Sequence, residues 1–285
     1  MKPPQFDYEA PRSLDQVLDL LAEAQDGATI LAGGQSLIPL LNMRFARPEL
    51  VIDINRVEGL DTIAVSQAAV SLGSTVRLGM LVNDAGVRSV LPVLSRASSF
   101  VAHPQIRART TVGGTLSHAD PSAALPAVAV ALGAMIHLRS RLGSRTVAAE
   151  DFFESVFTTS KEPDEIIVSV DFPLHTGLAF TYDEISRRQG DFPFAGLCLG
   201  VSLENGVVLE ARAAAAGVSD VPQRLVGVEG ALIGRPIAEV AEDAANAAAA
   251  EVNPPEDIHG SSDFRRGLLR SLVRGAIATL TEEQK

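Results

Sequence analysis

Apolar residues near the start of the chain recur every three to four positions, a spacing that predicts an amphipathic helix. Ser13 and Gln16 have the spacing of a capping box, so we expect the helix to begin there. Short apolar runs at residues 29–31 and 50–54 predict buried strands, and a second helix is expected over residues 37–44. These elements predict a small α/β unit.

The pattern of apolar and polar residues changes in the middle of the chain. Short alternating runs there predict strands, and longer apolar stretches predict helices. We expect paired strands at 62–65 and 69–72, helices at 87–100 and 121–132, further strands at 134–138 and 165–172, and a loop at 105–117.

The last third predicts a hairpin followed by helices. Strands at 197–203 and 207–216 flank Asn205-Gly206, a pair that accepts the positive φ angles of a tight turn. Helices are expected at 236–252 and 262–280. A length of 285 residues favours two or three units over one.

The chain is acidic, with 24 Lys and Arg against 35 Asp and Glu and a formal charge of −11. This balance argues against a nucleic-acid partner, because affinity for phosphate backbones depends on clustered cations. The single cysteine, Cys198, excludes an internal disulfide and an iron–sulfur cluster held by this chain alone. Without a signal-peptide core or a run of about 20 apolar residues, no transmembrane segment is expected, and we expect a cytoplasmic protein.

Two glycine pairs are the candidates for binding chemistry. The first lies in Ala32-Gly33-Gly34-Gln35-Ser36, after a predicted strand, and the second in Thr110-Thr111-Val112-Gly113-Gly114-Thr115. Glycine lets main-chain N–H groups approach a ligand, and a run of such groups forms an anion nest. Two nests suit a diphosphate, although each pair taken alone is also typical of an ordinary turn. Neither pair matches the Rossmann or P-loop fingerprint, so spacing alone indicates only a nucleotide-like anion site.

The longer strings around these glycines resemble a known family, the FAD-binding medium subunits of molybdenum hydroxylases such as carbon monoxide dehydrogenase and xanthine dehydrogenase. Residues 32–44 read AGGQSLIPLLNMR and resemble the first flavin loop of that family. Residues 106–121, IRARTTVGGTLSHADP, resemble its second loop, and residues 187–192, RRQGDF, resemble the element that opens its C-terminal domain. The likeness extends in order from near residue 5 to about residue 280.

The resemblance implies an α+β fold with a two-subdomain FAD-binding region of the PCMH/VAO type, followed by a C-terminal domain of antiparallel sheet and helices. It implies boundaries at residues 1–56, 57–174 and 175–285. FAD would bind non-covalently and pass electrons from an iron–sulfur small subunit to an external acceptor such as NAD⁺, a quinone, a cytochrome or oxygen. A large subunit would carry the molybdenum cofactor and the small one [2Fe–2S] clusters, in a dimer of heterotrimers.

The same resemblance assigns no catalytic or metal-binding residue to this chain, and it implies a set of cofactor-binding residues. Residues 32–36 would surround the pyrophosphate with main-chain N–H groups, residues 111–115 would line its other side, and Asp120 would lie near the ribityl or adenosine portion. The full set is Ala32, Gly33, Gly34, Gln35, Ser36, Leu37, Thr110, Thr111, Val112, Gly113, Gly114, Thr115, His118, Asp120, Arg187 and Phe192.

Three positions depart from the family pattern. Thr115 replaces an asparagine, and Ala124 replaces a common acidic residue. Glu184 occupies a position where some relatives have a lysine near the flavin ring, so a positive charge there must come from Arg187 or Arg188 or be absent.

The remaining candidates have alternative interpretations. His103 and His118 lack the carboxylate spacing of a metal site, and His118 is a candidate cofactor contact. Cys198 lies in an apolar strand and is expected in the core. Arg187 and Arg188 fit either a solvated pair or a position near the ring, and Phe192 fits either ring stacking or core packing.

Two other functions stay open from the residues. A free-standing FAD-dependent oxidase or reductase would need its own substrate pocket and a base, and no base is evident. A nucleotide-binding module without enzymatic activity would be colourless when purified.

Overall fold

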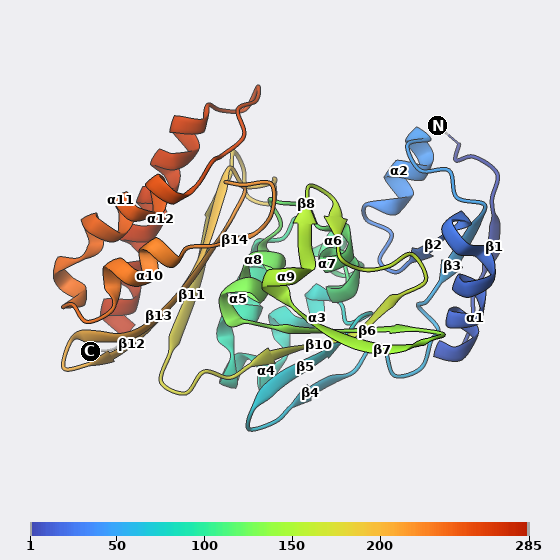
Figure 1. The fold of residues 1–285 in the computed structure, drawn as a ribbon, viewed down its shortest axis with the longest axis horizontal. Coiled ribbons are helices and arrows are strands. Elements are labelled where there is room, and N and C mark those ends of the chain that lie inside the picture. Colours follow the sequence, from blue (N-terminus) through green and yellow to red (C-terminus); the bar gives the residue numbers. More distant parts are fainter. Residues whose placement is uncertain (1, 284–285) are drawn as a thin grey trace.

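The computed structural model describes residues 2–283, which form three larger sheets and one two-stranded ribbon. Figure 1 shows the N-terminal unit at the right, the middle part at the centre in cyan to yellow-green, and the C-terminal sheet with its helices at the left. The mixed arrangement of helices and sheets confirms the expected α+β fold class.

The N-terminal unit contains a parallel sheet in the order β1-β3-β2. The expected capping box is present, since the Ser13 hydroxyl accepts from the N–H of Gln16 at 3.3 Å and the Gln16 side chain accepts from the N–H of Ser13 at 3.4 Å. Buried leucine and valine side chains of the first helix pack into a core with the third strand. The elements are β1 (Asp7–Glu9), α1 (Leu14–Ala24), η1 (Gln25–Gly27), β2 (Ala28–Leu31), α2 (Leu37–Met43) and β3 (Leu50–Asp53).

The middle part contains an antiparallel sheet in the order β4-β5-β10-β6-β7, with helices packed over it. The expected pairing of the two strands near residues 62–72 is confirmed. The strands are β4 (Ile63–Val65), β5 (Ala69–Gly73), β6 (Met135–Ser140), β7 (Gly143–Ala148) and β10 (Ile166–Pro173), with the ribbon β8 (Phe153–Ser155) and β9 (Thr158–Thr159). The helices are α3 (Leu78–Asn83), α4 (Ala85–Val90), α5 (Pro92–Phe100), α6 (Pro104–Arg107), α7 (Val112–His118), α8 (Ala124–Leu132) and α9 (Ala149–Phe152).

Three expectations for this part were wrong. The helix over 87–100 is divided at Leu91, because Pro92 lacks an N–H and starts a new helix. The stretch 105–117 is not a loop, since it contains most of α6 and α7. The helix expected from residue 121 begins only at Ala124, after a turn in which Asp120 accepts a hydrogen bond from the N–H of Ser122.

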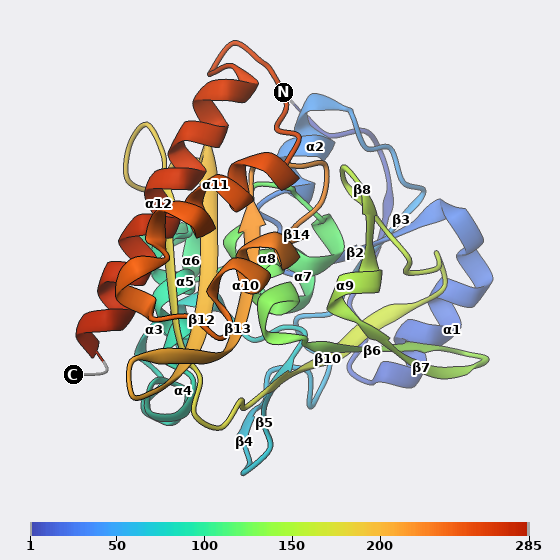
Figure 2. The same ribbon diagram turned by 60° about the vertical axis from the view of Figure 1, so that its left-hand side comes forward.

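The C-terminal part is an antiparallel sheet covered by helices on both faces, as the turned view in Figure 2 helps to show. The hairpin is confirmed, with Asn205 and Gly206 at φ 52° and 79°. Helices α10 to α12 pack on one face, and α5 and α8 of the middle part contact the sheet as well. The elements are β11 (Ala179–Ile185), β12 (Ala195–Glu204), β13 (Val207–Ala216), β14 (Gln223–Arg224), α10 (Val226–Leu232), η2 (Ile237–Glu239), α11 (Ala241–Glu251) and α12 (Ser262–Glu283).

The three sheets use strands from residues 7–53, 63–173 and 179–224. The division of the chain at 56/57 and 174/175 stays a prediction. Within residues 2–283, no helix is both long enough and apolar enough to span a bilayer.

Candidate functional site

A cavity of about 900 Å³ is lined by residues from all three parts of the chain. Fourteen of the sixteen predicted site residues contribute to its wall, and two do not: Val112 is fully buried in the core, and Arg187 is exposed. The fourteen are Ala32, Gly33, Gly34, Gln35, Ser36, Leu37, Thr110, Thr111, Gly113, Gly114, Thr115, His118, Asp120 and Phe192.

The first glycine segment connects β2 to α2 and requires both of its glycines. Gly34 has φ +73°, a conformation that side chains disfavour. A Cβ added at Gly33 would lie 2.3 Å from the carbonyl oxygen of Arg109, in the chain just before the second segment. The two segments therefore touch through their main chains, and only glycine permits this contact.

The main-chain N–H groups of residues 33–37 donate to no acceptor among the residues that the structure describes. The neighbouring main chain is bonded normally, since the N–H of Ile38 donates to Gly34 O at 3.1 Å. Five consecutive donors beside a cavity are the arrangement that an anion nest requires.

The second glycine segment differs. The N–H of Gly114 donates to Thr111 Oγ1 at 3.1 Å, and the N–H of Gly113 donates to Ser74 O at 2.8 Å. The N–H groups of Val112 and Thr115 are also bonded within the protein. The interpretation of this segment as a second nest of free amides was therefore wrong. The N–H groups of Gly114 and Thr115 donate to Thr111, the N-cap of α7, and the N–H of Gly113 ties the segment to Ser74.

The glycines of the second segment allow close packing. A Cβ at Gly113 would lie 2.6 Å from Ser74 Cβ, and one at Gly114 would lie 2.6 Å from Thr111 Oγ1. The segment can thus form a smooth wall of the cavity. Ser74 lies in that wall too, and its buried hydroxyl has no partner within residues 2–283.

The histidine and phenylalanine candidates both line the cavity. The His118 ring lies 4.9 Å from the ring of Phe157, and burial lowers the pKa of His118, while the charge of Asp120 opposes that change. Phe192 is 72% exposed, so its interpretation as a core residue was wrong. Arg188, like its neighbour, is exposed and lies outside the cavity wall.

Glu184 contributes a carboxyl to the cavity wall from β11. The hydroxyl of the fully buried Tyr182 donates to Glu184 Oε2 at 2.7 Å. Burial raises the pKa of Glu184 to about 7, the nearby charge of Asp183 adds to the rise, and the hydrogen bond from Tyr182 opposes it. The sequence identified this position only as a departure from the family pattern.

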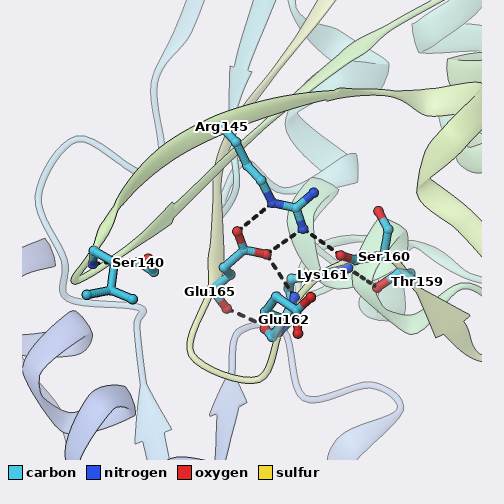
Figure 3. Close-up of polar contacts among 8 residues, drawn as sticks. Ser140, Arg145, Thr159, Ser160, Lys161, Glu162 and Glu165 are labelled. Carbon is cyan, nitrogen blue, oxygen red and sulfur yellow. Dashed lines mark hydrogen bonds and ion pairs between the residues drawn. The ribbon is translucent and has the colours of Figure 1, made fainter.

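Lys161 also lines the cavity, and sequence analysis missed it. Figure 3 shows it in the turn between β9 and β10, beside Arg145 and Glu165. Its Nζ donates to Glu162 O at 2.8 Å and to Glu165 O at 3.1 Å. The signal that could have identified it is the scarcity of lysine: the sequence contains only Lys2, Lys161 and Lys285.

Cys198 is buried in β12, which confirms it as a core residue, and burial raises the pKa of its thiol. No cluster of three or more histidine, cysteine, aspartate or glutamate side chains suited to a metal occurs in the described part of the chain. His103 is exposed and does not line the cavity.

The residues present fit an elongated anionic dinucleotide. The cavity volume lies in the upper range for ligand sites, which is about 300–1,000 Å³. The free amides of residues 33–37 suit a diphosphate, and many apolar side chains in the wall suit aromatic rings.

Residues 4–175 match the family described as FAD binding domain in molybdopterin dehydrogenase, and residues 180–280 match the CO dehydrogenase flavoprotein C-terminal domain. The chain is 40% identical over 282 residues to the 6-hydroxypseudooxynicotine dehydrogenase complex subunit alpha of Paenarthrobacter nicotinovorans, covering 98% of this chain and 95% of that one. It is 33% identical over 279 residues to the carbon monoxide dehydrogenase medium chain of Hydrogenophaga pseudoflava, covering 97% of each.

A solved structure agrees with these relatives over the whole fold. A chain in the crystal structure of quinoline 2-oxidoreductase from Pseudomonas putida 86 matches with a TM-score of 0.94 at 35% identity, covering 98% of both chains.

Proposed function

The chain belongs to the family of FAD-binding medium subunits of molybdenum hydroxylases, and on that premise we propose that the cavity between its three parts is the FAD site. Its family membership makes it the flavoprotein subunit of a multi-subunit oxidoreductase, with an electron-transfer role. The observation that supports the proposed site is the row of five free main-chain N–H groups at residues 33–37 beside a cavity of sufficient volume.

In this proposal the main chain of residues 33–37 binds the diphosphate. Backbone donors hold an anion without a basic patch, which reconciles an anionic cofactor with a chain of charge −11. The segment from Thr110 to Thr115 forms the opposite wall through its side chains and its close packing, since its amides are mostly in use. His118, Asp120 and Phe192 complete the wall.

The isoalloxazine ring of FAD supplies the exchange of electrons, a chemistry that the side chains of this protein do not provide. The protein's role is to bind the cofactor, to orient its ring and to shield it from solvent. We therefore propose binding roles, and no catalytic acid, base or metal ligand, for the predicted site residues. The chain passes electrons from an iron–sulfur subunit to an external acceptor.

The names of the relatives support a proposal about the partner subunits of this chain. The relatives carry names such as medium chain or complex subunit, so they work within larger enzymes. We propose that this chain assembles with a small subunit that carries [2Fe–2S] clusters and a large subunit that carries the molybdenum cofactor, as a dimer of heterotrimers in the cytoplasm. We also propose the three-part division at residues 1–56, 57–174 and 175–285.

Purification of the tagged chain from its native host, under conditions that preserve complexes, tests this function. We expect visible flavin absorption, release of FAD on denaturation, and two further chains in constant ratio, with molybdenum and iron assigned to those chains. A colourless preparation would contradict the FAD site. A yellow chain that purifies alone and oxidises an organic donor would favour the alternative, a free-standing FAD-dependent oxidase or reductase.

A further inference from the structure

Lys161 is the one lysine or arginine in the wall of the large cavity, within the part of the chain that the structure describes. The same wall carries four acidic side chains: Asp26, Asp120, Asp191 and Glu184, the last with a pKa of about 7. An anionic ligand entering this cavity therefore meets mostly negative side chains. The position of a single ammonium group then matters for where the negative charge of the ligand can lie.

The ammonium of Lys161 is held in place but not neutralised by direct contact. It is half-buried, and its Nζ donates to two main-chain carbonyls, Glu162 O and Glu165 O. An ammonium has three N–H donors, so one remains after these two bonds. No carboxylate oxygen within residues 2–283 lies within 4.0 Å of this nitrogen.

The carboxylate of Glu165, the obvious counter-ion for Lys161, is already bonded to other groups. Both carboxylate oxygens of Glu165 accept hydrogen bonds from Arg145 at 2.7 Å, and the N–H of Glu162 donates to Oε2 at 2.8 Å (Figure 3). Arg145 also donates to Ser160 O at 2.5 Å. These bonds close the turn at residues 160–165 and leave the Lys161 ammonium without a carboxylate in direct contact. Burial lowers the pKa of Lys161, and the nearby charges of Glu165, Asp164 and Glu162 oppose that change.

The turn lies where two parts of the protein meet. Ile166, directly after it, packs into the core of the N-terminal unit, whereas the strand it starts belongs to the middle sheet. Strand β9, directly before it, contacts α7, the helix that starts in the second glycine segment. The segments on either side of the turn thus pack against the N-terminal unit and against α7, and Lys161 lies between them in the cavity wall.

We propose that Lys161 is the cationic side chain that recognises the diphosphate-bearing half of the dinucleotide, together with the amides of residues 33–37. The inference depends on the proposed FAD site and adds a charged residue that neither glycine segment contains. A half-buried ammonium without a carboxylate in direct contact gains from a ligand that brings negative charge, because reduced contact with water strengthens that attraction.

The first test compares Lys161→Gln with Lys161→Arg in the purified, flavin-depleted complex. Glutamine keeps N–H donors for the carbonyls but removes the charge, whereas arginine keeps the charge. We expect Lys161→Gln to weaken binding of FAD and of ADP about tenfold or more, with Lys161→Arg close to wild type and riboflavin, which lacks phosphate, unaffected. Equal loss with riboflavin would assign Lys161 a purely structural role and overturn the proposal.

The second test uses the flavin-depleted wild-type complex, whose cavity is free to bind ADP, and depends on no variant. Mild acetylation of amines, followed by mass spectrometry, is measured with and without saturating ADP. We expect ADP to slow modification of Lys161, while Lys2, which is exposed and outside the cavity, serves as the internal control. Equal labelling of Lys161 in both conditions would overturn the proposal.

The two proposals fail in different ways. If the wild-type complex binds no FAD, the proposed function fails and the role of Lys161 with it. If wild type binds FAD and Lys161→Gln binds FAD and ADP equally well, the FAD site stands and only the assignment of Lys161 is wrong.

Discussion

The hydroxyl of Tyr182 donates a 2.7 Å hydrogen bond to Oε2 of Glu184, two residues further along β11. Alternate residues of a strand share a face, so this bond runs along one side of the sheet edge, from the core toward the cavity. The pair places a carboxyl with a pKa of about 7 in the wall of the proposed flavin site.

Glu184→Gln is expected to change how stability depends on pH. The ordinary pKa is 4.5 and burial raises it to about 7, so between these values the folded protein retains a proton that the unfolded chain has lost. Stability of the wild type therefore falls as pH rises through this window, by about 2 kcal/mol after allowance for partial exposure. Denaturant unfolding at about pH 5 and pH 8 measures the effect.

Glutamine does not titrate, so the free energy of unfolding of the variant should rise relative to that of the wild type as the pH rises. Glu210→Gln, at an exposed position on β13, is the matched control and should follow the wild type. A wild type and a Glu184→Gln variant with parallel pH profiles would contradict the raised pKa.

Gly33→Ala should separate the two segments that face the cavity. The new methyl would lie 2.3 Å from Arg109 O, so the first segment must move, and we expect FAD affinity to fall at least about tenfold, near 1.4 kcal/mol. The measurement is the flavin-to-protein absorbance ratio after purification. Gly267→Ala in α12, where a Cβ meets nothing within 4 Å, should keep full flavin content and gain about 0.5–1 kcal/mol of stability.

Thr111→Ala should destabilise the start of α7. It removes the oxygen that accepts from the N–H of Gly114, and loss of an N-cap costs about 1 kcal/mol. Thr111→Ser retains an oxygen at the same place and should lie within about 0.5 kcal/mol of wild type. Chemical unfolding measures the free energy of unfolding of both variants. Equal losses of stability in the two would show that the Thr111 methyl group, and not the N-cap hydrogen bond, is responsible.

Glu165→Gln should lower stability near neutral pH by about 1–3 kcal/mol, because a neutral amide replaces the buried carboxylate that accepts two charge-assisted hydrogen bonds from Arg145. Burial would raise the pKa of Glu165, but hydrogen bonds from Arg145 and Glu162 outweigh it and lower the pKa below 4.5. The stabilisation is therefore present above about pH 4.5 and lost as the pH falls through the folded-state pKa.

The exposed pair of Arg274 and Glu242 is a matched control with the same two-bond geometry. Glu242→Gln should change the free energy of unfolding little, since exposed ion pairs contribute little to stability. A Glu165→Gln variant that behaves like Glu242→Gln at all pH values would contradict the structural role of the Arg145 contact.

Sequence patterns succeeded where local and tertiary requirements coincide. Asn205-Gly206 has the positive φ angles that the dipeptide favours, and strands of equal length extend on both sides. They failed where a glycine serves packing. Gly113 and Gly114 suggested a loop, yet they lie in α7, because glycine in a helix can also permit close approach to a neighbour such as Ser74.

The candidate site was predictable only in part for a similar reason. The first glycine segment is continuous in sequence, so its approach to a ligand could be inferred. Lys161 lies in the turn between β9 and β10, and Glu184 lies near the end of β11. Only the folded chain brings both to the cavity, so no local sequence pattern indicates them. Strand β7 was missed because its exposed Ser144, Arg145 and Thr146 lack apolar alternation.

The close approach of Gly33 to the Arg109 carbonyl helps to determine the width of the cavity. The gap between its walls is set by two stretches of backbone resting on each other, not by side chains that can be exchanged. Any side chain at residue 33 would push these two stretches apart, so the width of the proposed flavin site depends on this position having none.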